Sequence, residues 1–378
     1  MKRITLVILL IAAGCASGAR DRGVPAAMKA GDYTAEAGPT PVGVIPVATL
    51  HDARRNKDVD LSIDYPTRGG PFPVIVFSHA YGLSNKDYEP LIAYWTSNGY
   101  VCIRPAHADA GALRERMREV MPEQGREGMR GRRGARGTPP PQQPQTQAAA
   151  RPNPLEEFWQ KQTPEQWRDR AEDVRLVVDS LSVLEQQFPE LQGKMDHATI
   201  GVAGHSYGAL TALLEAGMRT FGSPAIDFAG SRVKAVIAME PPALSEGHGI
   251  TAQSFANLHV PVLFMSITDE NGAFESSPAG DKYSVRIAGG GPMTFTGMGG
   301  FRGGFDRERP VQTSTGTYAR QQMPQTAVSV GPGAAFQTIE ITSLAFWDAY
   351  LKNETSARDL LQPEKYNASF SGATLTRK

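Results

Sequence analysis

The sequence predicts an α/β fold in which a mostly parallel sheet is covered by helices on both faces. Continuous apolar runs of strand length, such as 73–79 and 199–204, alternate with longer helix-like stretches such as 163–187 and 336–353. Strands that are buried on both faces have this apolar character, and parallel strands need helical crossovers between them. With 378 residues, 40% of them hydrophobic, the chain is long enough to bury a large core.

The elements can be assigned in chain order. Residues 44–50 and 59–66 alternate apolar and polar side chains on either side of a charged turn, which predicts an antiparallel hairpin. The helix expected at 163–187 opens with Thr163 and Pro164, a typical N-terminal signature. The remaining expected elements are strands at 73–79, 100–107, 199–204, 233–240, 260–267 and 283–289 and helices at 89–99, 209–218 and 336–353.

Charge and cysteine content exclude several classes of protein. Lys and Arg number 39 and are balanced by 39 Asp and Glu, whereas a dedicated nucleic-acid binder has a basic excess. Two cysteines, Cys15 and Cys102, are too few for a disulfide framework or a Cys-rich zinc site. No H-E-x-x-H motif or ligand-spaced acidic cluster is present, so no metal or cofactor is expected. The oligomeric state is left open.

The N-terminus predicts export. Residues 1–14 combine a basic start with an apolar run that is shorter than the roughly 20 residues needed to span a membrane, as in a signal peptide. The run ends in A-A-G-C, which resembles a lipobox, so Cys15 is predicted to be lipidated and residues 15–40 to form a tether. The protein is then expected as an outer-membrane or periplasmic lipoprotein of the cell envelope, held to the membrane by its lipid; ordinary cleavage near 16–19 would make it secreted instead.

The predicted domain, 41–378, contains two unusual segments. Residues 111–153 are rich in Arg, Pro and Gln, and their few large apolar side chains cannot offset the entropy cost of ordering, which predicts a disordered insertion. Its alternative role is attachment to anionic lipid or polysaccharide. Residues 289–310 contain a loose G-x-G-x-x-G-like spacing that does not lead from a strand into a helix, so nucleotide binding is not expected.

One motif carries the chemistry. Residues 204–208 read G-H-S-Y-G and lie between an apolar strand and an apolar helix. In this context G-x-S-x-G predicts a sharp turn that presents the serine hydroxyl above the sheet, so Ser206 is the expected nucleophile. Gly204 and Gly208 are expected because side chains there would collide with the backbone of the turn.

A second turn completes the expected oxyanion hole. Residues 77–82, F-S-H-A-Y-G, end an earlier strand, and in such sheets the turn at this place lends one backbone N–H to the oxyanion. Tyr81 is the expected donor, with Ala80 as the alternative. The second donor is the residue after the nucleophile, Tyr207. His79 is expected to be a hydrogen-bonded structural residue.

The order of these segments resembles the α/β-hydrolase superfamily. More narrowly it is similar to bacterial relatives of platelet-activating-factor acetylhydrolase and dienelactone hydrolase, over about residues 41–110 and 160–353. The resemblance implies an α/β-hydrolase fold and a serine esterase that acts on a small-molecule ester through an acyl-enzyme. It does not specify the ester, because this fold supports many activities.

The acid of the expected triad has three candidates. Asp269 and Glu270 both follow the 260–267 strand, and position relative to family members favours Glu270. In the acetylhydrolase branch the acid follows the preceding strand, which points here to Glu240.

The histidine departs from the family pattern. Relatives place it after the last strand, where this chain reads A-G-G-G-P-M at 288–293, and no histidine occurs from 260 to 378. A serine hydroxyl without a base is a poor nucleophile at neutral pH. His248 is the expected replacement, because its loop follows the 233–240 strand and should emerge at the same sheet edge as Ser206; His107 is second. Otherwise the protein is a catalytically silent surface binding protein.

Overall fold

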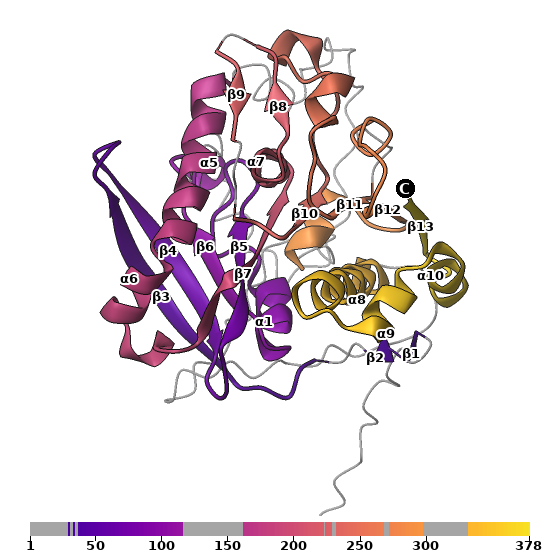
Figure 1. Cartoon of the computed structure of the whole chain (residues 1–378), viewed down its shortest axis with the longest axis horizontal. Coiled ribbons are helices and arrows are strands. Elements are labelled where there is room, and N and C mark those ends of the chain that lie inside the picture. The colour runs from indigo at the N-terminus through magenta and orange to yellow at the C-terminus, as the bar shows by residue number, and fades with distance from the viewer. Residues whose placement is uncertain are drawn as a thin grey trace, which may run out of the picture.

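The computed structural model has one mixed nine-stranded sheet with helices on both faces (Figure 1). This confirms the α/β-hydrolase fold predicted from the sequence. The expected signal peptide, Cys15 and most of the 111–153 insertion lie outside the described residues, so these predictions stay predictions. The structure describes residues 29–30, 33–34, 37–115, 162–222, 224–228, 232–267, 272–297 and 332–378.

The sheet has the order β13-β12-β11-β10-β7-β5-β6-β4-β3. The six strands from β12 to β6 run parallel, so their carboxyl ends meet at one edge, and β3, β4 and β13 are antiparallel additions at the two sides. The strands are β3 (Val42–Asp52), β4 (Lys57–Pro66), β5 (Phe72–Ser78), β6 (Val101–Pro105), β7 (Met195–His205), β10 (Ala235–Met239), β11 (Val262–Ser266), β12 (Lys282–Ile287) and β13 (Ala373–Arg377).

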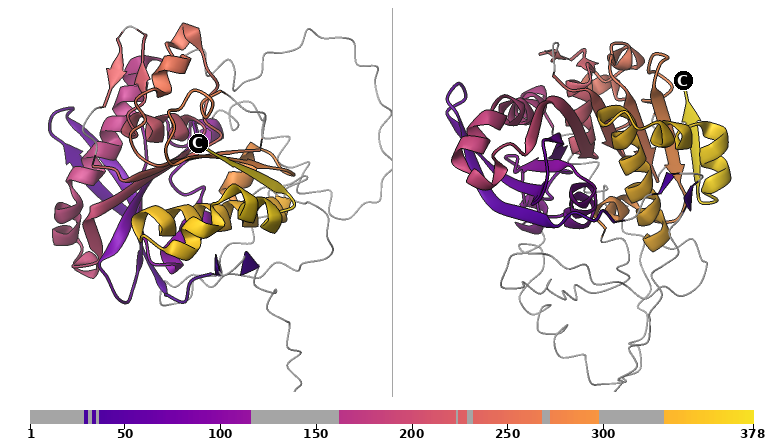
Figure 2. Two further views of the ribbon diagram at one scale, coloured as in Figure 1. Left: turned by 45° about the vertical axis from the view of Figure 1, so that its right-hand side comes forward. Right: turned by 60° about the horizontal axis from the view of Figure 1, so that its bottom comes forward.

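Two hydrophobic cores lie on opposite faces of the sheet. Figure 2 shows the helices that lie over these two faces. Because successive side chains of a strand point to opposite faces, Val74 and Val76 of β5 pack in one core and Ile75 and Phe77 in the other. The first core is covered by α5 (Pro164–Asp179), α6 (Leu181–Gln187) and α7 (Tyr207–Glu215). The second is covered by α1 (Glu89–Ser97), α8 (Pro332–Leu351), α9 (Thr355–Leu360) and α10 (Pro363–Ser369).

The helix expected at 163–187 is two helices. It begins as predicted, because the Thr163 side chain accepts from the Gln166 amide and the Gln166 side chain accepts from the Thr163 amide. It ends at Ser180, which caps α5 and precedes α6, so the single-helix prediction was wrong at this point. Serine at such a position competes with the helical hydrogen bonds.

The structure also contains elements that the sequence did not predict, among them several short strands and turns of helix. The sequence did not predict α9, α10 or β13; of these, β13 pairs with β12 and ends the sheet. In the part of the chain that the structure covers, no helix is both long and apolar enough to cross a membrane. The short elements are β1 (Lys29–Ala30), β2 (Tyr33–Thr34), β8 (Arg219–Thr220), β9 (Ile226–Asp227), η1 (Pro189–Leu191), η2 (Glu246–His248), η3 (Ala252–Phe255) and η4 (Pro292–Thr296).

Candidate active site

Ser206 occupies the turn between β7 and α7 in a strained conformation. Its φ is 54° and its ψ is −114°, a region that a non-glycine residue adopts at a cost of about 1–3 kcal/mol. The turn is held by a hydrogen bond of 2.7 Å from the Ser206 amide to the Met239 carbonyl. The residue is partly exposed, and within the described residues its hydroxyl has no hydrogen-bond partner. The strand–helix corner thus presents a hydroxyl that is not used for structure.

Close backbone contacts explain both glycines of the motif. A Cβ atom on Gly204 would lie 2.0 Å from the carbonyl oxygen of Gly208. A Cβ atom on Gly208 would lie 2.0 Å from the carbonyl oxygen of Ser78, at the end of β5. Real Cβ atoms do not approach backbone atoms so closely, so glycine at both positions lets the elbow pack directly against the turn after β5.

The turn after β5 orders the expected oxyanion donors. The Ala80 amide donates to the Tyr88 hydroxyl at 3.1 Å, so the alternative donor is engaged elsewhere. The Gly82 amide donates to Asp109 at 2.9 Å. Tyr81 lies between them, and its ring meets the ring of Tyr207 edge-on at a centroid distance of 6.4 Å. These contacts bring the rings of the two expected donor residues together, and the choice between Tyr81 and Ala80 as donor stays a prediction.

His107 belongs to a buried serine–histidine–carboxylate chain. Its Nδ1 lies 2.9 Å from Asp173, and because a carboxylate only accepts, Nδ1 carries the proton. Nε2 then accepts from the Ser78 hydroxyl at 2.9 Å. Burial, followed by the charge of Arg170, holds the pKa of His107 well below its usual range. Ser78 and Asp173 are 0% exposed, so this chain braces the core and does not meet a substrate.

Two further histidines are buried behind the site. His79 accepts from the His107 amide through Nε2 at 3.2 Å and lies 2.8 Å from the Ala80 carbonyl through Nδ1. His205 receives a hydrogen bond of 2.8 Å from Tyr88, and burial lowers its pKa to about 3. Burial and the charge of Arg170 likewise lower the pKa of His79. Both rings are neutral and support the turn.

Glu240 is the candidate acid that the structure places near Ser206. The register pairs Met239 with His205, so the next residues, Glu240 and Ser206, follow each other across adjacent parallel strands. Glu240 also has a positive φ of 48° without being glycine. Its carboxylate accepts from the Ile267 amide at 2.5 Å, at the end of β11. Such strained residues cluster at functional sites.

The other two acids, Asp269 and Glu270, lie outside the described residues. Since nothing in the structure compares them with Glu240, the choice among the three candidates stays open.

His248, the expected base, lies in η2 at the same end of the sheet. Its Nδ1 is 2.7 Å from the Ser245 hydroxyl, and its ring lies 5.8 Å from the Trp167 ring. Trp167 precedes Arg170 by one turn of α5, and the Arg170 guanidinium covers the Tyr207 ring at 4.4 Å. His248 thus packs against α5 with its Nδ1 bonded to Ser245, and its role as base stays a prediction.

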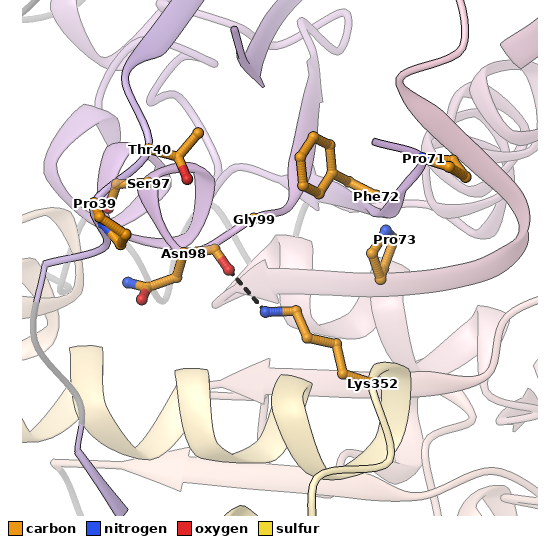
Figure 3. Close-up of a pocket in the computed structure, with 9 residues that line it drawn as sticks. All are labelled: Pro39, Thr40, Pro71, Phe72, Pro73, Ser97, Asn98, Gly99 and Lys352. Carbon is orange, nitrogen blue, oxygen red and sulfur yellow. Dashed lines mark hydrogen bonds between the residues drawn. The ribbon is translucent and has the colours of Figure 1, made fainter. Parts of the chain in front are cut away.

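One pocket lies away from Ser206. Figure 3 shows this pocket of ≈ 470 Å³, where the Lys352 ammonium donates to the Asn98 carbonyl at 2.7 Å. It is lined by Phe72, which begins β5, and so lies at the amino ends of the parallel strands. Ligands of open α/β sheets bind at the carboxyl ends, where Ser206 stands, so this pocket is not the candidate active site. Among the described residues no cluster of His, Cys, Asp or Glu could hold a metal ion.

Comparison with known families supports the hydrolase assignment. A chlorophyllase family model matches residues 32–121, about a quarter of the chain. The matched segment includes the hairpin, β5, the turn with Tyr81, α1 and β6, and it ends before Ser206. No curated protein matches the chain. The fold is that of the α/β-hydrolases, and over residues 32–121 the chain is similar to an ester-hydrolase family of this type.

Proposed function

We propose that the protein is a serine hydrolase that cleaves small-molecule carboxylic esters through an acyl-enzyme on Ser206. The observation that carries the proposal is the strained elbow, in which Ser206 has a φ of 54° and a hydroxyl with no hydrogen bond in the described part of the chain. Strain of this kind persists only where the surrounding structure enforces it, and it is concentrated at active sites. The chlorophyllase match supports ester chemistry at a coarse level.

The expected reaction has two steps. The Ser206 hydroxyl attacks the acyl carbon and gives its proton to the base, for which we propose His248, and the alcohol leaves with a proton returned by that base. Water then attacks the acyl-enzyme and releases the acid. In both steps the negative charge on the acyl oxygen is stabilised by the amides of Tyr81 and Tyr207. Glu240, Glu270 or Asp269 would hold the protonated base.

The narrower resemblance to bacterial relatives of platelet-activating-factor acetylhydrolase and dienelactone hydrolase is part of this proposal. It accounts for the order of the elbow, the turn after β5 and the C-terminal helix, and it leaves the ester open.

Ser206→Ala is expected to abolish the activity. Removing the nucleophile of a serine hydrolase lowers turnover by about 10⁶-fold, to the residual rate that binding and the oxyanion hole support. The purified protein without its N-terminal segment should react with a fluorophosphonate at Ser206 and hydrolyse short p-nitrophenyl esters. The mass of the labelled peptide identifies the site. Ser356→Ala, at an exposed serine of α9, is the control and should behave as wild type.

His248→Ala is expected to slow both labelling and ester hydrolysis by about 10³-fold or more, because the serine then lacks its base. His51→Ala is the matched control, since His51 is exposed and pairs with Asp58 on the β3–β4 hairpin. Steady-state rates of the three proteins at neutral pH decide the assignment. Wild-type activity in His248→Ala would reject His248 as the base while leaving Ser206 as the nucleophile.

One observation favours a second function. The loop after β12, where relatives carry the triad histidine, contains none at 288–293. If the wild type neither reacts with fluorophosphonate nor hydrolyses esters, and Ser206→Ala is indistinguishable from it, the elbow belongs to a surface binding protein that no longer performs catalysis.

A further inference from the structure

We propose that Arg170 is a positioning residue that holds the two halves of the oxyanion hole at a fixed separation. Arg170 lies on α5, and the sequence places it in neither turn of the site. The inference rests on the proposed hydrolase function and goes beyond it, because it assigns a role in catalysis to a side chain that does not touch the substrate.

Arg170 fixes the turn that carries Tyr81. Its guanidinium donates to the His79 carbonyl at 2.9 Å, which lies on one side of Tyr81. It also donates to both carboxylate oxygens of Asp109, at 3.0 and 3.2 Å. Asp109 in turn accepts from the Gly82 amide at 2.9 Å, on the other side of Tyr81. The peptide groups that flank the first donor are thus tied to one rigid fork of N–H groups.

The same guanidinium meets the second donor residue. Its central carbon lies 4.4 Å from the centre of the Tyr207 ring, a cation–π contact. Tyr207 is the first residue of α7, so its main chain belongs to the elbow. Arg170 is 2% exposed, and such contacts are stronger when water is excluded. One side chain therefore joins the turn after β5 to the elbow after β7.

The helix that carries Arg170, α5, is itself held in place by buried contacts. One turn later on α5, Asp173 accepts from Arg55 at 2.7 Å and from Lys57 at 2.9 Å, at the β3–β4 hairpin. Asp173 also binds His107 at 2.9 Å, at the end of β6. Burial alone would raise the pKa of Asp109, but the charge of Arg170 and the other partners outweigh burial and lower this pKa. These contacts fix α5 relative to the β3–β4 hairpin and to the segment that follows β6.

A small displacement of the donors should have a large kinetic effect. Loss of one oxyanion donor costs about 10²–10³-fold in rate, and a misplacement of about 1 Å can cost about 10²-fold. Lysine at position 170 keeps the positive charge but replaces the planar fork by a single ammonium, which cannot reach His79, both oxygens of Asp109 and the Tyr207 ring together.

Arg170→Lys tests the proposal through the kinetics of fluorophosphonate labelling and ester hydrolysis. We expect the labelling rate constant and kcat to fall by about 10–10²-fold, with KM changed by less than about threefold, because the lost interaction acts in the transition state. The final extent of labelling should stay at one group per protein. Arg175→Lys is the matched control, since Arg175 lies on the same helix and stacks on Phe228 at 4.5 Å, away from the turn.

The outcomes separate the alternatives. If Arg170 is only structural, Arg170→Lys lowers the labelled fraction while the competent molecules react at the wild-type rate, and the proposal is overturned. If Arg170→Lys does not fold, Asp109→Asn replaces it, because it weakens the same fork while Arg170 stays; a wild-type labelling rate in that variant overturns the proposal as well. If the wild type is not labelled, the hydrolase function itself is refuted. That result needs no variant, so it can be told apart from a failure of the Arg170 proposal.

Discussion

Gly208→Ala is expected to destabilise the protein and to abolish labelling at Ser206. Helix propensity alone would predict stabilisation by about 1 kcal/mol, since Gly208 lies in α7. The new Cβ would however lie 2.0 Å from the Ser78 carbonyl oxygen and 2.8 Å from the His79 carbonyl oxygen, and both are backbone atoms that cannot rotate away. Overpacking costs about 1–3 kcal/mol even where side chains can yield, so we expect a loss at or above the upper end of that range.

Urea unfolding followed by fluorescence measures the loss, and the fluorophosphonate labelling rate measures the site. Gly333→Ala is the control, because Gly333 lies near the start of α8 and nothing lies within 4 Å of the position that its new Cβ would occupy. It should be neutral or slightly stabilising. An unfolding midpoint and a labelling rate for Gly208→Ala equal to those of the wild type would show that the elbow does not press against β5 as the structure has it.

The fold was predictable because its signals are local. The strands β5, β10 and β11 are almost continuous apolar runs, and the G-x-S-x-G turn marks where β7 meets α7. The need for both glycines could be explained from the motif alone. The structure adds that the Ser78 carbonyl oxygen is the atom that a side chain on Gly208 would strike. The C-terminal strand β13 carried no such signal, because Ala373–Arg377 alternates at an edge and only its pairing with β12 defines it.

The buried polar contacts that hold the turns of the site in place were not predictable from one sequence. In the helix expected at 163–187, Arg170 and Asp173 look like members of a solvated polar face. Both are buried, because their partners come from distant parts of the chain: Asp109 is 61 residues from Arg170, and Arg55 is 118 residues from Asp173. Helical periodicity reports which residues share a face and not which charges that face will meet.

The positions of the candidate acid and base were also only partly predictable from the sequence. Glu240 follows Ser206 across the sheet only because β10 pairs with β7 in parallel register, a relation between strands that no local pattern contains. Strand order predicts the edge of the sheet at which His248 emerges, whereas its hydrogen bond to Ser245 depends on the conformation of its own loop. Strand order therefore predicts the neighbourhood of a side chain, and loop conformation decides its contacts.

Acidification is expected to destabilise the protein already at a pH above the range where carboxylates titrate. His79, His107 and His205 are buried, and burial holds the pKa of each ring below the usual 6.5. Between the lowered pKa and about 6.5 the unfolded chain binds more protons than the folded one, so stability falls as the pH falls through this window and levels off below it. The charges that face these rings include those of Asp109, Asp173, Arg170, Arg55 and Lys57.

The loss in the free energy of unfolding depends on how many pH units separate the lowered histidine pKa from about 6.5. A ring whose pKa lies below the pH costs about 1.4 kcal/mol for each pH unit below about 6.5, so His205, with a pKa of about 3, costs about 2 kcal/mol at pH 5. His79 and His107 add to this loss, because burial lowers their pKa values as well. A domain has only about 5–15 kcal/mol of stability in total, so a measurable part of it should be lost before the carboxylates protonate. Asp109 adds to the loss at lower pH, because its pKa is also lowered and its stabilising charge disappears as the pH falls through that value.

His205→Gln isolates one ring, because glutamine can still accept from Tyr88 and does not titrate. The free energy of unfolding should then fall less steeply between pH 6 and pH 4, by about 1.4 kcal/mol per pH unit. His51→Gln, at an exposed ring, should leave the slope unchanged. A free energy of unfolding that stays constant from pH 7 to pH 5 would mean that water reaches these rings. The burial of the three histidines behind Ser206 would then be contradicted.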